Sequence, residues 1–166
     1  MKIKTKFFGG IDIADDQIIL YPYGIYGFEE YNRFVLLHDI DYEEENETVF
    51  RFLQCADEEH LCFTVMAPEY IERDYAPKLP DKAVKKLGAD SGEGLTYLVI
   101  AMINENLEES TANMQGPIVI NSKNMIGAQI ILETSEPENA RYQIKHKIFG
   151  VYGEAELVEE GAAVKC

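Results

Sequence analysis

Apolar and polar residues alternate along much of the chain, which is the pattern of β-strands whose two faces have different surroundings. In residues 2–7, lysines alternate with Ile3, Thr5 and Phe7, so a strand there would have one wet face. The run 98–103 is apolar at every position and predicts a central strand that is covered on both faces. Further runs of strand composition lie at 17–21, 33–38, 49–54, 61–66, 95–103, 118–120 and 128–132, with a less regular run at 142–148.

Helical signals are few. The stretch 80–88 starts with a proline, has Asp81 available to cap the first turn, carries lysines in its last turn and ends at Gly88. A second short turn is expected near 137–141. Parallel strands need long crossover connections, which this chain lacks. The pattern therefore predicts a mainly β, single-domain, antiparallel β-barrel-like fold with one or two short helices.

The length of 166 residues fits one domain. We expect the β domain to span residues 1–152. Residues 153–166 carry four glutamates followed by small residues, and we expect them to form a mobile acidic tail.

Charge is the unusual feature of the composition. Fifteen Lys and Arg stand against 30 Asp and Glu, which gives a net charge of −15. A surface this acidic repels phosphate groups, so direct binding to nucleic acid or to an anionic membrane is disfavoured and a basic protein partner is favoured.

The compartment follows from the amino terminus and the cysteines. No apolar stretch near residue 1 is long enough for a signal peptide or a membrane span. Cys55, Cys62 and Cys166 are an odd number of thiols, so they cannot all pair within the chain, and we read Cys55 and Cys62 as buried structural thiols. These observations predict a cytoplasmic protein.

Patterns for catalysis or cofactor binding fail on inspection. The acidic loop 39–47 begins like a calcium loop, but Glu44 stands where glycine is required and Phe50 where a bidentate glutamate is required. The glycine-rich stretch 88–94 lacks the lysine of a phosphate loop. The three histidines have no partner at metal-ligand spacing, and no serine elbow is present. We therefore expect no catalytic residues, no metal and no cofactor.

One group of polar and aromatic residues lies at predicted strand ends and turns, where recognition surfaces are often built. The alternative is that the asparagines and prolines among them simply form turns. The group comprises Gln54, Pro68, Tyr70, Tyr75, Asn113, Gln115, Pro117 and Asn121.

Several of these residues belong to segments that resemble the bacterial flagellar assembly factor FliW family. The block 113–121, which begins Asn113-Met114-Gln115-Gly116-Pro117 and lies within the matching range 110–121, is the most specific. Other matching segments, in the same order and spacing, are 6–9, 19–29, 52–55, 67–75 and 128–132. Departures from the family pattern are Tyr26 in place of proline, Cys55 in place of serine, Met114 in place of leucine and Gly116 in place of alanine.

The resemblance implies a β-barrel-like fold and a role that is not enzymatic. Members of the family bind flagellin in the cytoplasm, and many also bind CsrA, a basic RNA-binding repressor of flagellin translation. Export of flagellin frees the family member to capture the repressor, so filament supply is coupled to filament synthesis. The net charge of this chain suits such a basic partner.

On this reading, the residues expected at or beneath a partner-binding surface are Gln54, Tyr75, Asn113, Gln115, Pro117 and Asn121. The acidic segments 39–47 and 57–59 are candidates for electrostatic steering of the partner. The alternative from another class is a small-ligand-binding β-barrel or a hydrolase of unknown substrate, because antiparallel barrels can enclose a pocket.

Overall fold

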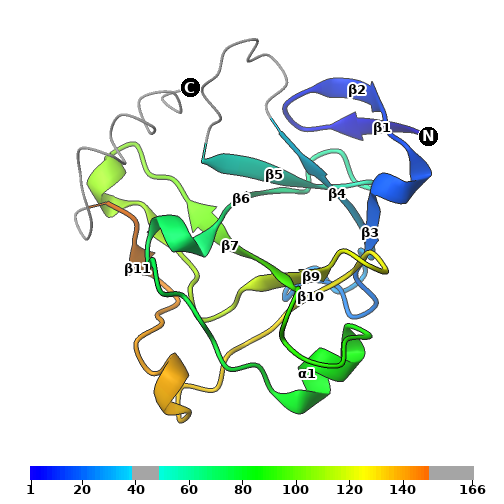
Figure 1. The fold of residues 1–166 in the computed structure, drawn as a ribbon. Coiled ribbons are helices and arrows are strands. Elements are labelled where there is room, and N and C mark those ends of the chain that lie inside the picture. Colours follow the sequence, from blue (N-terminus) through cyan, green and yellow to red (C-terminus); the bar gives the residue numbers. More distant parts are fainter. Residues whose placement is uncertain (39–48, 150–166) are drawn as a thin grey trace.

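The fold is a closed β-barrel with additional segments packed on its outside (Figure 1). The computed structural model describes residues 1–38 and 49–149. Seven of the strands in these residues form a ring in which each strand pairs with the next and the last returns to the first. In pairing order they are β3 (Ile18–Leu20), β4 (Arg33–Leu37), β5 (Phe50–Cys55), β6 (Cys62–Met66), β7 (Thr96–Met102), β9 (Ile118–Asn121) and β10 (Ile126–Gln129).

The predicted antiparallel barrel is confirmed, with one parallel contact at the point of closure. There β10 pairs with β3 in parallel through Ile126 and Leu20, and the backbone N–H of Leu20 donates to the carbonyl of Met125 at 2.9 Å. The other pairings around the ring are antiparallel. A single parallel contact needs no crossover helix within the strand pair, because the chain reaches it after passing around the whole barrel.

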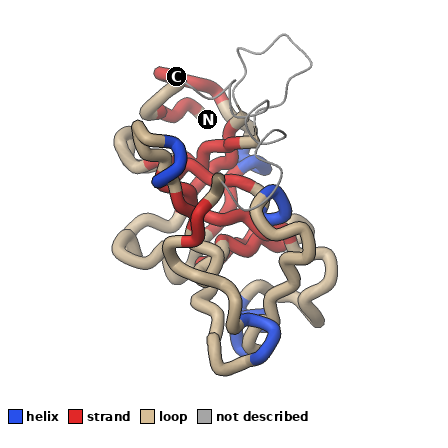
Figure 2. The backbone as a smooth tube through the Cα atoms, turned by 90° about the vertical axis from the view of Figure 1, so that its left-hand side faces the viewer, coloured by secondary structure: helices blue, strands red, loops and turns tan. Residues whose placement is uncertain are grey.

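Four more strands among the described residues lie outside the ring. The hairpin of β1 (Lys2–Thr5) and β2 (Gly9–Asp12) forms a separate two-stranded sheet, and β8 (Thr111–Ala112) and β11 (His146–Lys147) extend the second half of β7. Figure 2 shows the strands in the middle and upper part of the molecule, and loops with a short helix at its lower end.

The helices described in the structure are short. Helix α1 (Asp81–Lys86) lies at the end of the molecule opposite the β1–β2 hairpin (Figure 1). The predicted helix start is partly wrong, since Pro80 is the N-cap and the Asp81 side chain makes no capping hydrogen bond. The described residues also contain four 3-10 helices, at Asp15–Gln17, Pro68–Tyr70, Leu107–Glu109 and Pro137–Asn139, and the last of these is the short turn expected near 137–141. None of the described helices is long and apolar enough to cross a membrane.

Alternating side chains fill the barrel. Phe34, Leu53, Val65, Leu98 and Ile118 belong to one buried cluster, and they come from five different strands of the ring. Because neighbouring residues on these strands belong to other clusters, this set points to the inside. The interior is therefore packed with side chains.

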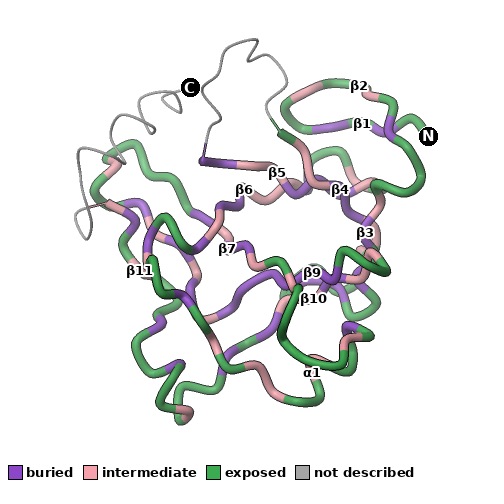
Figure 3. Tube along the Cα trace, viewed as in Figure 1, coloured by how far each residue is buried: buried purple, intermediate pink, exposed green. Residues whose placement is uncertain are grey.

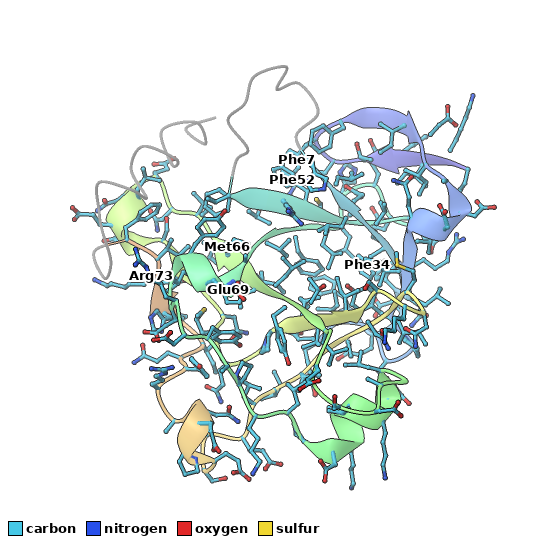
Figure 4. All side chains as sticks on the ribbon, viewed as in Figure 1. Phe7, Phe34, Phe52, Met66, Glu69 and Arg73 are labelled. Atoms are coloured by element: carbon cyan, nitrogen blue, oxygen red, sulfur yellow. The ribbon has the colours of Figure 1, made fainter. Side chains whose placement is uncertain are left out.

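The outside of the barrel is covered on two sides. Val99, Val119 and Met66 face outward from β7, β9 and β6, and they are buried under segments that include Met114 and Tyr142. On another face, a smaller cluster includes Ile3 of β1, Ile13 directly after β2 and Val35 of β4. Figure 3 shows buried positions along the barrel strands and exposed ones along most connections. At the hairpin, Phe7 lies beside Phe52 with ring centres 5.2 Å apart (Figure 4).

Three strand predictions need correction. The run 98–103 is covered on both faces only in its first part, because Met102 and Ile103 are exposed. The strand expected at 128–132 starts and ends earlier, as β10. In the run 142–148 only His146–Lys147 forms a strand.

Candidate functional site

A groove of about 300 Å³ lies between three segments that are distant in the sequence. Its walls are the turn 23–29, helix α1 with the preceding Pro80, and residues 128–131 at the end of β10. Three large apolar or aromatic side chains of the lining are exposed: Tyr23 by 57%, Tyr26 by 61% and Ile131 by 43%. Exposed aromatic side chains around a hollow are typical of protein-recognition surfaces.

The first wall is a tight turn that is anchored in the barrel. Ile25 is buried in the barrel cluster, while Tyr23 and Tyr26 on either side of it are exposed. Gly24 has φ +67°, and a Cβ at this position would lie 2.4 Å from the Cα of Glu29, so no larger residue fits there. The Glu29 carboxylate accepts a hydrogen bond from the Gly27 N–H at 3.0 Å, which lowers the pKa of Glu29.

The second wall is helix α1, which is fixed at its carboxyl end. Two side-chain amides, from Asn121 at 2.9 Å and Asn124 at 3.0 Å, donate to the carbonyl oxygen of Leu87, the C-cap residue. These bonds satisfy a carbonyl that the helix itself leaves unpaired. Lys86 also reaches toward the first wall, with its Nζ 4.4 Å from the centre of the Tyr23 ring.

The third wall is connected to the first by the side chain of Gln129. Its Oε1 accepts a hydrogen bond from the Tyr26 N–H at 3.1 Å, and its Nε2 donates to the Gly116 carbonyl at 3.2 Å. A Cβ at Gly116 would lie 3.2 Å from Nε2 of Gln129 and 2.8 Å from Nδ2 of Asn113. Glycine at this position therefore leaves space for both amides.

Residues 113–117 of the predicted block 113–121 lie directly behind this third wall. The carbonyls of Gln115 and Pro117 accept from the N–H groups of Leu132 at 2.8 Å and Ile130 at 3.0 Å. The Oδ1 of Asn113 accepts from the N–H of Gly116 at 2.9 Å and closes the turn. The block thus holds residues 130–132 in place, although β10 has already ended.

The six predicted site residues divide into two groups. Tyr75, Asn113, Gln115, Pro117 and Asn121 support the groove, since the Tyr75 hydroxyl donates to the Met114 carbonyl at 2.8 Å and Asn121 holds α1. Tyr75, Pro117 and Asn121 are buried, and Asn113 and Gln115 are half-buried. None of the six belongs to the lining of the groove.

Gln54 is at a different place, beside the β1–β2 hairpin. Its side chain is fully buried, and its Oε1 accepts from the Lys6 N–H at 3.0 Å. Its Nε2 lies 3.2 Å from the Glu58 carbonyl and 3.1 Å from the Glu59 carbonyl. Gln54 therefore joins the hairpin to the acidic turn 57–59. In this turn Asp57 pairs with Arg33, and the hydrogen bond from that guanidinium lowers the pKa of the Asp57 carboxyl.

Sequence reasoning missed the residues that line the groove, namely Tyr23, Tyr26, Lys82, Lys86, Gln129 and Ile131. The signal that could have found four of them was the family resemblance, since Tyr23 and Tyr26 lie in the matching segment 19–29 and Gln129 and Ile131 in the matching segment 128–132. The acidic loop 39–47 and the acidic tail 153–166, both singled out from the sequence, lie outside the described residues.

The remaining chemical candidates do not form a reactive centre within the part of the chain that the structure describes. No group of three His, Cys, Asp or Glu side chains in it is placed to hold a metal ion. Cys55 is buried as expected, whereas Cys62 is only half-buried. Burial raises the pKa of Cys62 to about 11, so its thiol stays protonated and unreactive near neutral pH.

Comparison with known proteins identifies the family. The family model described as FliW protein matches residues 2–148. This chain belongs to the FliW family. The resemblance seen in the sequence is thereby confirmed.

Individual relatives agree with this assignment. The flagellar assembly factor FliW of Leptospira interrogans serovar Copenhageni is 36% identical over 150 residues, which cover 90% of this chain and 93% of that protein. The FliW of Clostridium tetani is 37% identical over 149 residues, covering 90% and 96%. A crystal structure of the flagellar assembly factor FliW superposes with a TM-score of 0.77 at 31% identity, covering 90% of this chain and 98% of that chain. These matches cover nearly the whole chain, and the superposition shows that the chain has the FliW fold.

Proposed function

We propose that this chain binds cytoplasmic flagellin and antagonises a CsrA-type RNA-binding repressor by direct protein–protein contact. Flagellin synthesis would then be coupled to flagellin export. Membership of the FliW family supports a role in flagellar assembly. The observation that carries the proposal for this chain is the groove, which presents Tyr23, Tyr26 and Ile131 to solvent on a hydrogen-bonded frame.

The groove suits binding better than catalysis. Its carboxylate and its side-chain amide are already engaged, because Glu29 accepts from the backbone of its own turn and Gln129 makes two hydrogen bonds. A general base or nucleophile needs a partner that activates it. The barrel interior is filled by Phe34, Leu53 and their neighbours, which speaks against the alternative of a small-ligand barrel.

The proposed site has two layers. Side chains of the groove contact the partner, and Tyr75, Asn113, Gln115, Pro117 and Asn121 hold those side chains from beneath. Gln54 acts away from the groove, beside the β1–β2 hairpin, where it fixes the acidic turn 57–59.

Charge supports the choice of a basic repressor as the second partner. A net charge of −15 attracts a cationic RNA-binding protein and raises its association rate. Once bound, the acidic chain would repel RNA phosphates from the neighbouring surface. The same net charge disfavours direct binding of this chain to RNA or to an anionic membrane.

An RNA-release assay tests the proposal. A labelled flagellin leader RNA is bound to the purified repressor, and its fluorescence anisotropy is followed as this chain and then flagellin are added. We expect the chain to release the RNA and flagellin to restore the complex. RNA that stays bound at saturating concentrations of the chain would contradict the antagonism.

Repulsion of RNA by the bound acidic chain is tested separately by varying the salt concentration. Added salt should weaken RNA release more than it weakens binding of the chain to the repressor, because screening acts on repulsion between separated charges. If release is insensitive to salt while binding persists, repulsion of RNA is not the mechanism.

A further inference from the structure

The groove differs in charge from the molecule as a whole. The lining contains Lys82 and Lys86 from α1 and only one carboxylate, that of Glu29. This carboxylate is hydrogen-bonded to the Gly27 N–H, so part of its charge is compensated within its own turn. In a chain with a net charge of −15, the groove therefore has a locally positive wall.

The positive wall is available to a ligand. Lys82 is exposed and has no hydrogen-bond or ion-pair partner among residues 1–38 and 49–149. Lys86 rests against the face of the Tyr23 ring, a contact that orients the side chain across the groove without using its N–H donors in a hydrogen bond. The two ammonium groups thus border an apolar surface made by Tyr23, Tyr26 and Ile131.

The two lysines and the apolar surface beside them favour one of the two proposed partners over the other. A basic repressor would be repelled by the lysines, and its affinity would gain from acidic regions elsewhere on the chain. A segment with apolar side chains next to carboxylates would match both the apolar surface and the lysines.

We propose that the groove is the flagellin site, and that it receives a segment of flagellin in which apolar anchors are flanked by carboxylates. The anchors contact Tyr23, Tyr26 and Ile131, and the carboxylates face Lys82 and Lys86. The assignment rests on the proposed function, because it takes flagellin as a partner of this chain.

Charge reversal on one helix tests the assignment. Lys82→Glu places a negative charge in the groove, whereas Lys85→Glu makes the same change on an exposed residue of α1 that does not line it. By isothermal titration calorimetry with purified flagellin, we expect Lys82→Glu to weaken binding about three- to tenfold and Lys82→Glu with Lys86→Glu to weaken it further. The Lys85→Glu control should change the affinity by less than about twofold.

A second pair of variants tests the apolar surface. Ile131 is 43% exposed in the groove, and Ile144 is 59% exposed outside its lining. Ile131→Asp should weaken flagellin binding by about tenfold or more, while Ile144→Asp should leave it within about twofold. Thermal unfolding of each variant is measured alongside, and we expect a cooperative transition from both, as from the unmodified chain.

These experiments distinguish failure of the groove assignment from failure of the proposed function. If the unmodified chain binds flagellin and the groove variants bind as tightly as their controls, the groove assignment is overturned and the proposed function stands. If the groove variants lose affinity for the repressor and not for flagellin, the occupant is the repressor and the assignment to flagellin is wrong. If the unmodified chain does not bind flagellin, the proposed function itself fails.

Discussion

The ring of Tyr21 lies directly against Gly127, at the point where β3 and β10 close the barrel in parallel. A Cβ at position 127 would lie 2.6 Å from Cζ and 2.7 Å from Cε1 of Tyr21. Tyr21 is fully buried and also meets Phe34 edge to face, with ring centres 5.2 Å apart. The ring therefore has no room to move away, and closure of the barrel depends on a glycine at this position.

Gly127→Ala should lower the free energy of unfolding by about 2–3 kcal/mol, because the added methyl group overpacks the junction. Gly10→Ala is the matched control: its Cβ would have only the Ile3 carbonyl oxygen near it, at 4.0 Å. The control should stay within about 0.5 kcal/mol of the unmodified chain. Urea unfolding measures both, and equal effects would contradict the packing described for Tyr21.

Replacing tyrosine by phenylalanine is expected to affect stability differently at Tyr21 and at Tyr75. The Tyr21 hydroxyl is buried and has no hydrogen-bond partner among the described residues. Tyr21→Phe should therefore leave stability unchanged or raise it by up to about 1 kcal/mol. Tyr75→Phe removes the bond to the Met114 carbonyl and should lower stability by about 1–2 kcal/mol. A larger loss for Tyr21→Phe than for Tyr75→Phe in urea unfolding would show that the hydroxyl of Tyr21 is satisfied.

Burial also predicts how stability changes at alkaline pH. Desolvation raises the pKa of Tyr21, Tyr75 and Tyr97 above the value of about 10 that phenols have in the unfolded chain. The contribution of these tyrosines to the free energy of unfolding is fully present below a pH of about 10. It is lost as the pH rises further, because unfolding then releases their protons. The urea midpoint should fall between pH 9 and pH 11 by less in Tyr21→Phe than in the unmodified chain. An equal fall would rule out Tyr21 as a contributor.

The hydrogen bond from the Tyr26 N–H to the Gln129 side chain, here called the bridge, can be tested by a double-mutant cycle. The turn from Ile25 to Phe28 has Gly27 at φ +90° in its third position, and proline is common at the position of Tyr26 in such turns. Tyr26→Pro therefore fits the turn but removes the N–H that donates to Gln129. We expect a coupling of about 1 kcal/mol between Tyr26→Pro and Gln129→Ala in unfolding experiments, and additive effects in the control cycle with Tyr26→Phe, which keeps the N–H. Additivity in both cycles would contradict the bridge.

The side chain of Asn113 closes the turn behind the third wall of the groove, so its loss should affect partner binding. Asn113→Ala removes the acceptor for the Gly116 N–H, so the turn that holds the third wall loosens. We expect weaker capture of one partner, with the domain still folded as judged by circular dichroism. Asn106→Ala, on an exposed residue away from the groove, serves as the control. Unchanged affinity for both flagellin and the repressor would remove Asn113 from the site.

Much of the barrel could be predicted from the sequence because its strands are covered on one or both faces. In β4, β5 and β6 the buried positions supply strong apolar signals, as in Phe34 and Val35. The strand β10 was displaced in the prediction because Gly127 and Ala128 contribute little apolar area, whereas the bulky residues 130–132 follow after the strand has ended. These three residues still alternate in burial: Ile130 and Leu132 are buried and Ile131 is exposed.

The groove could not be predicted in the same way. Its walls come from segments about 50 residues apart, and no local pattern indicates that they meet. Asn121 illustrates the difficulty, since an asparagine at a strand end is typical of a turn. Its Oδ1 does accept from the Lys123 N–H in the turn at 3.1 Å, but its Nδ2 donates to the carbonyl of Leu87, 34 positions away in the chain. Only the tertiary arrangement distinguishes an amide that faces a partner from one that fixes a helix.

The central claim, that this chain exchanges flagellin for the repressor, is tested most directly by measuring capture of the purified repressor by the immobilised chain with and without one equivalent of flagellin. The account predicts saturable capture of the repressor by the chain alone and a marked reduction when flagellin is present. Failure to capture the repressor, or capture that flagellin does not reduce although flagellin itself binds, would contradict the account.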